Sequence, residues 1–191
     1  MNIRSAKESK NNILNAALKA FSEHGYSGAS MRMIAGYAGI SVGGLYLYFK
    51  NKEDLCRTLL KERLDELYGK VEKAVRNVND PVEAIEKFIT ICLEYARKHK
   101  EIILVQNRDK GLAFGIDVKR SFFHKQRELV EKIIEEGIRT GDFFECNTAE
   151  VTKIVIAVLR GFVLSILLEP DSLFSNKECC KFILRGLLKS K

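Results

Sequence analysis

The chain of 191 residues has only two prolines and few runs in which apolar and polar residues alternate. Proline breaks helices, and alternation of apolar and polar residues is the pattern of a half-buried strand. The scarcity of both indicates an all-helical protein and disfavours a β-rich one. A hydrophobic content of 46% is ample for a folded core, so the sequence predicts a globular chain.

The five cysteines lack the spacing of a metal site, because three are far apart and the last two, Cys179 and Cys180, are adjacent. Zinc ligands are usually separated by two residues. We therefore expect reduced, buried thiols. His124 and Glu128 share a helix face, but two ligands do not complete a metal site. No metal and no cofactor is expected.

Catalytic motifs are also missing. The sequence has no nucleophile with a positioned base, no glycine-rich phosphate loop and no GxSxG motif. The sequence therefore predicts a protein that is not an enzyme.

Signals for export or membrane insertion are missing too. The first twelve residues are polar and charged, unlike the apolar centre of a signal peptide. The most apolar run, residues 154–168, contains Arg160 and Gly161. It is shorter than the roughly 20 apolar residues that span a bilayer. We expect a soluble, cytoplasmic protein without a membrane partner.

Positive charge is concentrated near the N-terminus. Residues 1–63 contain ten Lys and Arg against five acids, which accounts for +5 of the net charge of +7. Lysine and arginine placed at DNA phosphates release condensed counterions and so strengthen binding at low salt. A solvated basic surface explains the charge equally well unless a DNA-binding motif accompanies it.

Such a motif begins with a short helix expected at residues 30–39. Ser30 can cap it by accepting a hydrogen bond from a free backbone N–H. Residues at helical spacing form its predicted buried face: Met31, Ile34, Ala35 and Ala38. Gly39 follows, where a helix exit commonly needs the left-handed conformation.

A second helix is expected from its cap Ser41 to about Tyr48. Leu45 and Phe49, spaced i and i+4, are expected to face the core. The outward side then carries Val42, Gly43, Gly44, Tyr46, Leu47 and Tyr48. Two helices joined so tightly form a helix-turn-helix. This outward face suits the major groove, because missing side chains allow close approach and tyrosine hydroxyls reach phosphate oxygens.

The segment resembles the DNA-binding region of the TetR family of transcriptional regulators. The matching residues are Ile34-Ala35, Ala38-Gly39-Ile40-Ser41, Gly43, Leu45-Tyr46, Tyr48-Phe49 and Lys52-Glu53-Asp54-Leu55. The segment ILNAALKAFSEHGY also fits the family pattern, as the helix that precedes the motif, with Gly25 where a C-terminal cap belongs. The resemblance is strong over residues 13–55 and only general beyond them.

The resemblance implies a homodimer that represses transcription by binding a palindromic operator, and that is released when a small molecule enters its C-terminal domain. The residues expected to contact DNA are Ser30, Arg32, Ser41, Val42, Gly43, Gly44, Tyr46, Leu47, Tyr48 and Lys52. Lys52 matches a family position that binds phosphate. The alternatives are a simple cap for Ser30, a surface charge for Arg32, and helix packing for the two tyrosines.

Two residues depart from the family pattern. Val42 occupies a position where many relatives carry lysine, so a phosphate contact is either missing or replaced by an apolar contact to a thymine methyl. Gly36 lies inside the first helix of the motif, where it costs roughly 1 kcal/mol relative to alanine. These departures affect the expected operator sequence and affinity, and leave the class unchanged.

Further helices are expected at residues 51–77, 80–98, 100–106, 117–140, 147–168 and 177–189. Their starts carry capping residues: Asn51, Asp80 followed by Pro81, and Asn147. In the family, the helix at 51–77 serves as a lever between ligand and DNA. A plain amphipathic connector is the alternative.

The helix at residues 148–168 is apolar on almost every side, so it must be buried, and the monomer's core covers only part of it. Together with residues 177–189 it is expected to pair with its copy as a four-helix dimer interface. The segment EEGIRTGDF, which precedes it, resembles the link found ahead of the last two helices in many family members.

The family places its effector site among the middle helices. The candidate lining residues are Phe88, Cys92, Tyr95, Phe122, Gln126, Val155, Leu159 and Phe162. Plain core packing is the alternative for each. This aromatic, weakly polar set favours an apolar or amphipathic effector.

The predicted fold is therefore all-α, with a three-helix helix-turn-helix DNA-binding domain at residues 1–50. A helical effector-binding and dimerisation domain is expected at residues 51–191. Two other classes stay open: a DNA-binding protein or activator without an effector, and a helical enzyme with an incidental helix-turn-helix.

Overall fold

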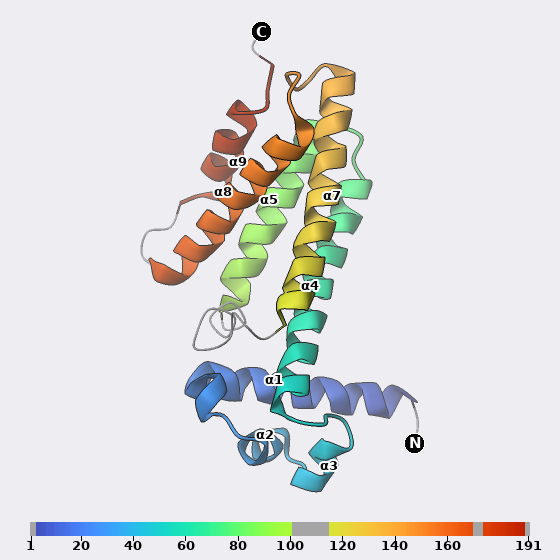
Figure 1. Cartoon of the computed structure of the whole chain (residues 1–191), viewed down its shortest axis with the longest axis vertical. Helices are drawn as coiled ribbons and strands as arrows, with labels where there is room; N and C mark the ends of the chain where they lie inside the picture. Colours follow the sequence, from blue (N-terminus) through green and yellow to red (C-terminus); the bar gives the residue numbers. More distant parts are fainter. Residues whose placement is uncertain (1–2, 101–114, 170–173, 190–191) are drawn as a thin grey trace. The chain divides into compact units, whose positions relative to one another are not determined.

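The structure is a computed structural model that describes residues 3–100, 115–169 and 174–189. These residues form α1 (Ile3–Gly28), α2 (Met31–Ala38), α3 (Val42–Tyr46), α4 (Lys52–Arg76), α5 (Pro81–Lys98), α7 (Ile116–Thr140), α8 (Thr148–Leu168) and α9 (Asn176–Arg185) (Figure 1). Among them, the only β interaction is an isolated bridge between Phe143 and Leu188. The predicted all-α fold is confirmed.

Most helix bounds follow the expected caps, but two helices end early. α3 ends at Tyr46, because the next backbone bonds, Leu47 N to Gly44 O at 3.3 Å and Tyr48 N to Leu45 O at 3.0 Å, tighten the last turn. α9 ends at Arg185, four residues before the predicted end. The helix expected at residues 100–106 lies outside the described residues except for its first position.

The described chain divides into two compact units. The first holds residues 3–64 and 115–119, and the second holds the remainder. The division falls inside α4, whereas the domain boundary was expected after residue 50. Leu55 and Leu59 explain the difference, because these residues at the start of α4 are fully buried in the core that α1, α2 and α3 form.

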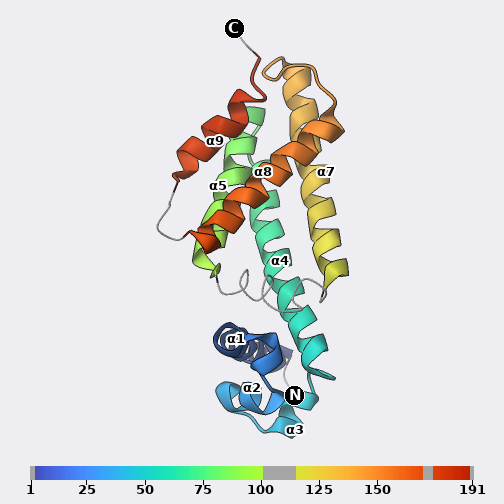
Figure 2. The same cartoon turned by 60° about the vertical axis from the view of Figure 1, so that its left-hand side comes forward.

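In the first unit α1 packs against α2 (Figure 2), and their buried faces carry small residues. Ala17 and Ala20 of α1 and Ala35 of α2 are fully buried, which allows the two helices to approach closely. Asn12 adds a polar tie, since its Nδ2 donates to the carbonyl oxygen of Ala38 at 2.7 Å. The helix-turn-helix is thus fixed to α1 through α2.

In the second unit, α5 packs against both α8 and α9 (Figure 1). The side chain of Asp80 caps α5 by accepting from Val82 N at 2.8 Å, with Pro81 in the first turn as predicted. α7 joins the same bundle, where its Val130 and Ile134 are fully buried. Among the described residues, no helix is both long and apolar enough to cross a membrane.

The chain leaves α7 through a tight reversal at Gly141, where a break was predicted. Phe143 then folds back onto α7, and its ring lies so close to Gly137 that a Cβ there would be 2.1 Å from a ring carbon. Phe144 N donates to Leu187 O at 3.0 Å, which ties the segment after α9 to this reversal. The apolar α8 therefore starts from an anchored turn.

Candidate nucleic-acid interface and effector region

α2 and α3 are held by caps that the sequence predicted. Ser30 Oγ accepts a hydrogen bond from Met33 N at 3.2 Å, and Gly39 ends α2 in the left-handed conformation with φ 67°. Ser41 Oγ accepts from Gly44 N at 3.0 Å. These caps fix the tight turn between the two helices, as a helix-turn-helix requires.

α3 is anchored on one side and exposed on the other. Leu45 and Phe49 are buried in the core of the first unit, as predicted. On the opposite side, Tyr46 is 51% exposed and Leu47 is 86% exposed. The buried Leu45 and Phe49 hold the backbone of this segment in place. Tyr46 and Leu47 therefore project outward from a supported backbone and present apolar surface and the tyrosine hydroxyl.

Val42 and Tyr48 do not lie fully on this outward face, where the sequence placed them. Both are half-buried and pack against the core of the first unit. Tyr48 lies beyond the end of α3, so its direction no longer follows the helical repeat. Leu47 is the more exposed apolar side chain of this segment.

The remaining candidates at the start of the two helices are accessible. Ser30, Arg32, Ser41 and Gly43 are exposed, and Gly44 is half-buried. A Cβ added to Gly43 would meet nothing within 4 Å, so internal packing does not explain a glycine there. At Gly44 a Cβ would lie 3.2 Å from Ser41 Oγ, so close packing against the helix cap partly explains the glycine at this position.

Lys52 has a structural role that the sequence did not indicate. Its ammonium donates to the carbonyl oxygens of Tyr26 at 2.6 Å and Ala29 at 2.7 Å, and lies 4.5 Å from the centre of the Tyr26 ring. An ammonium with these partners is directed toward the end of α1. The arrangement does not support the phosphate contact that was expected of this side chain, and we interpret Lys52 as a tie between α1 and α4.

A second tie inside the first unit was missed by sequence reasoning. Arg57, in the second turn of α4, forms a two-point ion pair with Asp117 at the start of α7. The hydrogen bond from Arg57 lowers the pKa of Asp117, because it favours the charged carboxylate. The two residues are sixty positions apart, and no local pattern marks such a pair.

The predicted effector residues separate into two groups. All except Phe162 are buried, in α5, α7 and α8. Gln126 Nε2 lies 3.7 Å from Cys92 Sγ, which brings the α5 and α7 candidates together. Phe162 is half-buried, and its ring lies 4.9 Å from that of Phe174 and 6.5 Å from that of Phe182.

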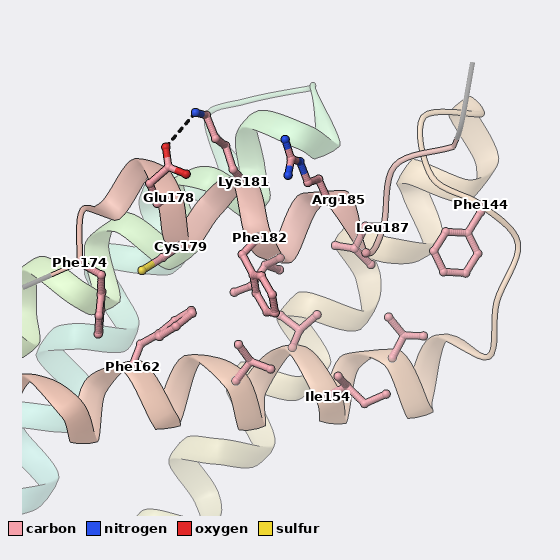
Figure 3. Close-up of a pocket in the computed structure, with 15 residues that line it drawn as sticks. Phe144, Ile154, Phe162, Phe174, Glu178, Cys179, Lys181, Phe182, Arg185 and Leu187 are labelled. Carbon is pink, nitrogen blue, oxygen red and sulfur yellow. Dashed lines mark hydrogen bonds and ion pairs between the residues drawn. The ribbon is translucent and has the colours of Figure 1, made fainter.

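Phe162 belongs to an open groove of about 950 Å³ between α8 and α9 (Figure 3). The groove is mostly apolar, with Ile154 and Phe162 from α8 and Phe182 from α9 in its lining. Its polar residues include Glu178 and Lys181, which form an ion pair at 2.8 Å. Val155 is the other effector candidate that lines it.

The buried cysteines are poor nucleophiles. Burial raises the pKa of Cys56 to about 11 and that of Cys92 to about 12. Thiolate, the reactive form, is therefore scarce at neutral pH. These thiols act as small apolar side chains in the two cores.

Comparison with known proteins places this site among regulators. A family described as "Bacterial regulatory proteins, tetR family" matches residues 13–59, which span the helix-turn-helix and the start of α4. The HTH-type transcriptional repressor KstR2 of Mycolicibacterium smegmatis is 27% identical over 137 residues, which cover 70% of this chain and 67% of that protein.

Solved structures extend the likeness to almost the whole chain. The TetR family transcriptional regulator PfmR from Thermus thermophilus is 25% identical with a TM-score of 0.75, and the match covers 93% of this chain and 99% of that one. FadR from Bacillus subtilis, solved in complex with stearoyl-CoA, is 21% identical with a TM-score of 0.79 and covers 93% and 97% of the two chains. This second likeness establishes a shared fold.

Proposed function

The chain belongs to the TetR family of transcriptional regulators, and we propose that it is a ligand-released repressor that binds a palindromic operator as a homodimer. It is a DNA-binding regulator and not an enzyme. The observation that carries the proposal is the capped helix-turn-helix, in which α3 is anchored by Leu45 and presents Tyr46 and Leu47 outward.

We assign DNA contact to the exposed side of this motif. The exposed residues Ser30, Arg32 and Ser41 lie at the starts of α2 and α3, where phosphate contacts commonly position a recognition helix. Gly43 leaves room for close approach to the base edges. Leu47 offers an apolar surface to thymine methyl groups, and the Tyr46 hydroxyl is available to phosphate oxygens.

We assign dimerisation to α8 and α9. Ile154, Leu164 and Phe182 are 60%, 42% and 66% exposed, which is unusual for large apolar residues on neighbouring helices. The groove of Figure 3 runs between the same two helices. A twofold pairing of this surface with its copy would bury these side chains and direct two α3 helices to one duplex.

We assign the effector to the buried candidates of α5, α7 and α8. Phe88, Cys92 and Phe122 are apolar or weakly polar, and Gln126 supplies one amide among them. Such a lining suits an apolar or amphipathic molecule. The stearoyl-CoA found in FadR of Bacillus subtilis is an amphipathic molecule of this kind.

Coupling between effector and DNA would pass through α4, which contributes residues to both compact units. The ion pair between Arg57 and Asp117 joins its second turn to the start of α7. We expect effector binding to change the separation of the two DNA-binding units in the dimer. Labels attached through Ser27→Cys, in a Cys146→Ser background, would report this separation with operator DNA and with stearoyl-CoA. Equal distances in the two states would refute the coupling.

Selection of bound sequences from random duplex DNA, followed by sedimentation of the complex, tests the proposal as a whole. We expect one dimer per duplex and a palindrome with half-sites about 10 base pairs apart, or a multiple of that spacing. A monomer that selects no sequence at low salt would contradict the assigned function.

A further inference from the structure

An arginine of α8 is stacked on an aromatic ring of α7. The guanidinium carbon of Arg160 lies 3.5 Å from the centre of the Phe123 ring. Stacking of this kind covers one face of the guanidinium and holds it in place. The N–H groups point outward from the edge of the plane, so they stay available to a planar or tetrahedral anion.

A second arginine, Arg127, lies one helical turn from the ring that Arg160 covers. Arg127 follows Phe123 by one helical turn on α7, so the two side chains share a helix face. Burial, followed by the positive charge of Arg127, lowers the pKa of Arg160. The two guanidinium groups therefore repel each other across the α7 and α8 contact, and an anion between them would remove this repulsion.

Neither arginine has an acidic partner among the residues that the structure describes. Other cations of the same unit do: Lys125 lies 3.8 Å from Asp65, and Arg139 lies 2.5 Å from Glu136. The contrast matters because paired cations are neutralised within the chain. Arg127 and Arg160 retain their charge and their donors for something outside it.

The arginine pair adjoins the predicted effector residues. The ring of Phe123, on which Arg160 lies, is 5.3 Å from the ring of the buried Phe122, and the buried Gln126 follows Phe122 by one helical turn. Two cationic groups thus lie beside apolar side chains of the same two helices. An amphipathic molecule with an anionic end matches this arrangement, because its charged end can meet the arginines while its apolar part meets the apolar side chains.

We propose that Arg127 and Arg160, the latter held by Phe123, form the binding site for the anionic head group of an amphipathic effector, a phosphate or a carboxylate. This inference rests on the proposed function, because it identifies the charge of the effector. The apolar part of the ligand lies against the buried candidates of α5, α7 and α8.

Calorimetric titration of the full chain with decyl phosphate, below its micelle concentration, tests the site directly. We expect one molecule of decyl phosphate to bind per chain. Its affinity should be about 10- to 100-fold lower for the double variant R127Q/R160Q, because the variant loses two charged hydrogen-bond donors. Arg120→Gln is the matched control, because Arg120 is an exposed arginine of the same helix. It should leave decyl phosphate affinity unchanged.

Three further ligands separate the sources of affinity. Decanoate tests a carboxylate head group, decanol tests the chain without charge, and inorganic phosphate tests the anion without the chain. We expect decanoate or decyl phosphate to bind more tightly than decanol, and the double variant to bind decanol as the parent does. Equal binding of decanol and both anions, or unchanged anion binding by the double variant, would overturn the proposal.

The double variant also distinguishes this inference from the proposed function. We expect it to remain dimeric and to bind the selected operator, because neither arginine lies in the helix-turn-helix. Dissociation into monomers with undiminished anion binding would assign the arginines to the subunit interface and overturn the proposal. Absence of operator binding by the parent chain would instead contradict the proposed function.

Discussion

The two compact units bury their apolar residues to different degrees. In the first unit, alanines and larger apolar side chains form one buried core. Its helix-turn-helix exposes only Tyr37, Tyr46 and Leu47 among the large apolar residues. In the second unit, α8 and α9 leave Ile154 and Phe182 more than half exposed. The first unit thus exposes only a few large apolar side chains on its helix-turn-helix, whereas the second exposes such side chains on two neighbouring helices.

The units also differ in how their candidate sites are built. The side chains proposed to contact DNA come from one segment of about twenty residues, and local caps position them. The surfaces proposed for effector binding and dimerisation depend on contacts between helices that are far apart in the sequence, such as those of α5 with α8 and α9. A site formed by one segment depends mainly on residues within that segment. A site formed by several helices depends on how these helices pack against one another.

The largest expected effect comes from removing the anchor of α3. Leu45 is fully buried, so Leu45→Ala should lower the free energy of unfolding by about 2–5 kcal/mol and abolish operator binding. Chemical denaturation and fluorescence anisotropy with operator DNA measure the two effects. A stable Leu45→Ala protein with normal operator affinity would show that the position of α3 does not depend on this core.

Substitution on the exposed face of α9 should lower operator affinity nearly as much, because it prevents dimerisation. Phe182→Glu places a charge on a side chain that is 66% exposed and lines the groove. We expect monomers in sedimentation and operator affinity about 100-fold lower, because linked half-sites lose their joint binding. Ile116→Glu, an equivalent change at a 46% exposed residue outside the groove, is the control and should remain dimeric. If the Phe182→Glu protein stays dimeric, α9 is not part of the dimer interface.

Lys52→Met separates a structural role from a phosphate contact. Loss of the donor to Tyr26 O and Ala29 O should lower the free energy of unfolding by about 1–3 kcal/mol. The slope of log affinity against log salt should stay unchanged, since a lost phosphate contact would reduce its magnitude by about 0.9. Lys50→Met, at an exposed neighbour, is the control for stability. A smaller slope for Lys52→Met than for the parent chain would show that Lys52 contacts a DNA phosphate.

The smallest effect is expected at the outward face of α3. Leu47→Ala should change the free energy of unfolding by less than about 0.5 kcal/mol, because the side chain is 86% exposed. Operator affinity should fall about tenfold if the leucine is buried against DNA. Replacing operator thymines one at a time by deoxyuridine should locate a single methyl group with a matching effect. Unchanged affinity of Leu47→Ala on every operator would exclude this contact.

The helix-turn-helix could be predicted from the sequence because its signals are local. Ser30, Gly39 and Ser41 act on backbone groups within a few residues, and the spacing of Leu45 and Phe49 follows from the helical repeat. The direction of Tyr48 was not predictable in this way, because it depends on packing against the core of the first unit.

The second unit allowed less to be predicted. Caps at Asp80 and Asn147 located the starts of α5 and α8, and the apolar character of α8 indicated a partner. The sequence grouped Phe162 with the buried effector candidates, but the structure places it with Phe174 and Phe182 in the groove. Spacing along one helix identifies a face and does not identify the helix opposite.

The order of the amino acids was sufficient to determine that this chain is all-helical, where most helices begin, and that residues 30–49 form a DNA-reading motif. Caps and helical periodicity act over three or four residues, so each can be read from its neighbours. Tertiary structure decided that Lys52 ties α1 to α4, that Arg57 pairs with Asp117, and that Arg160 lies on Phe123. These contacts join residues more than twenty positions apart, and only the packing of whole helices brings their atoms within bonding distance.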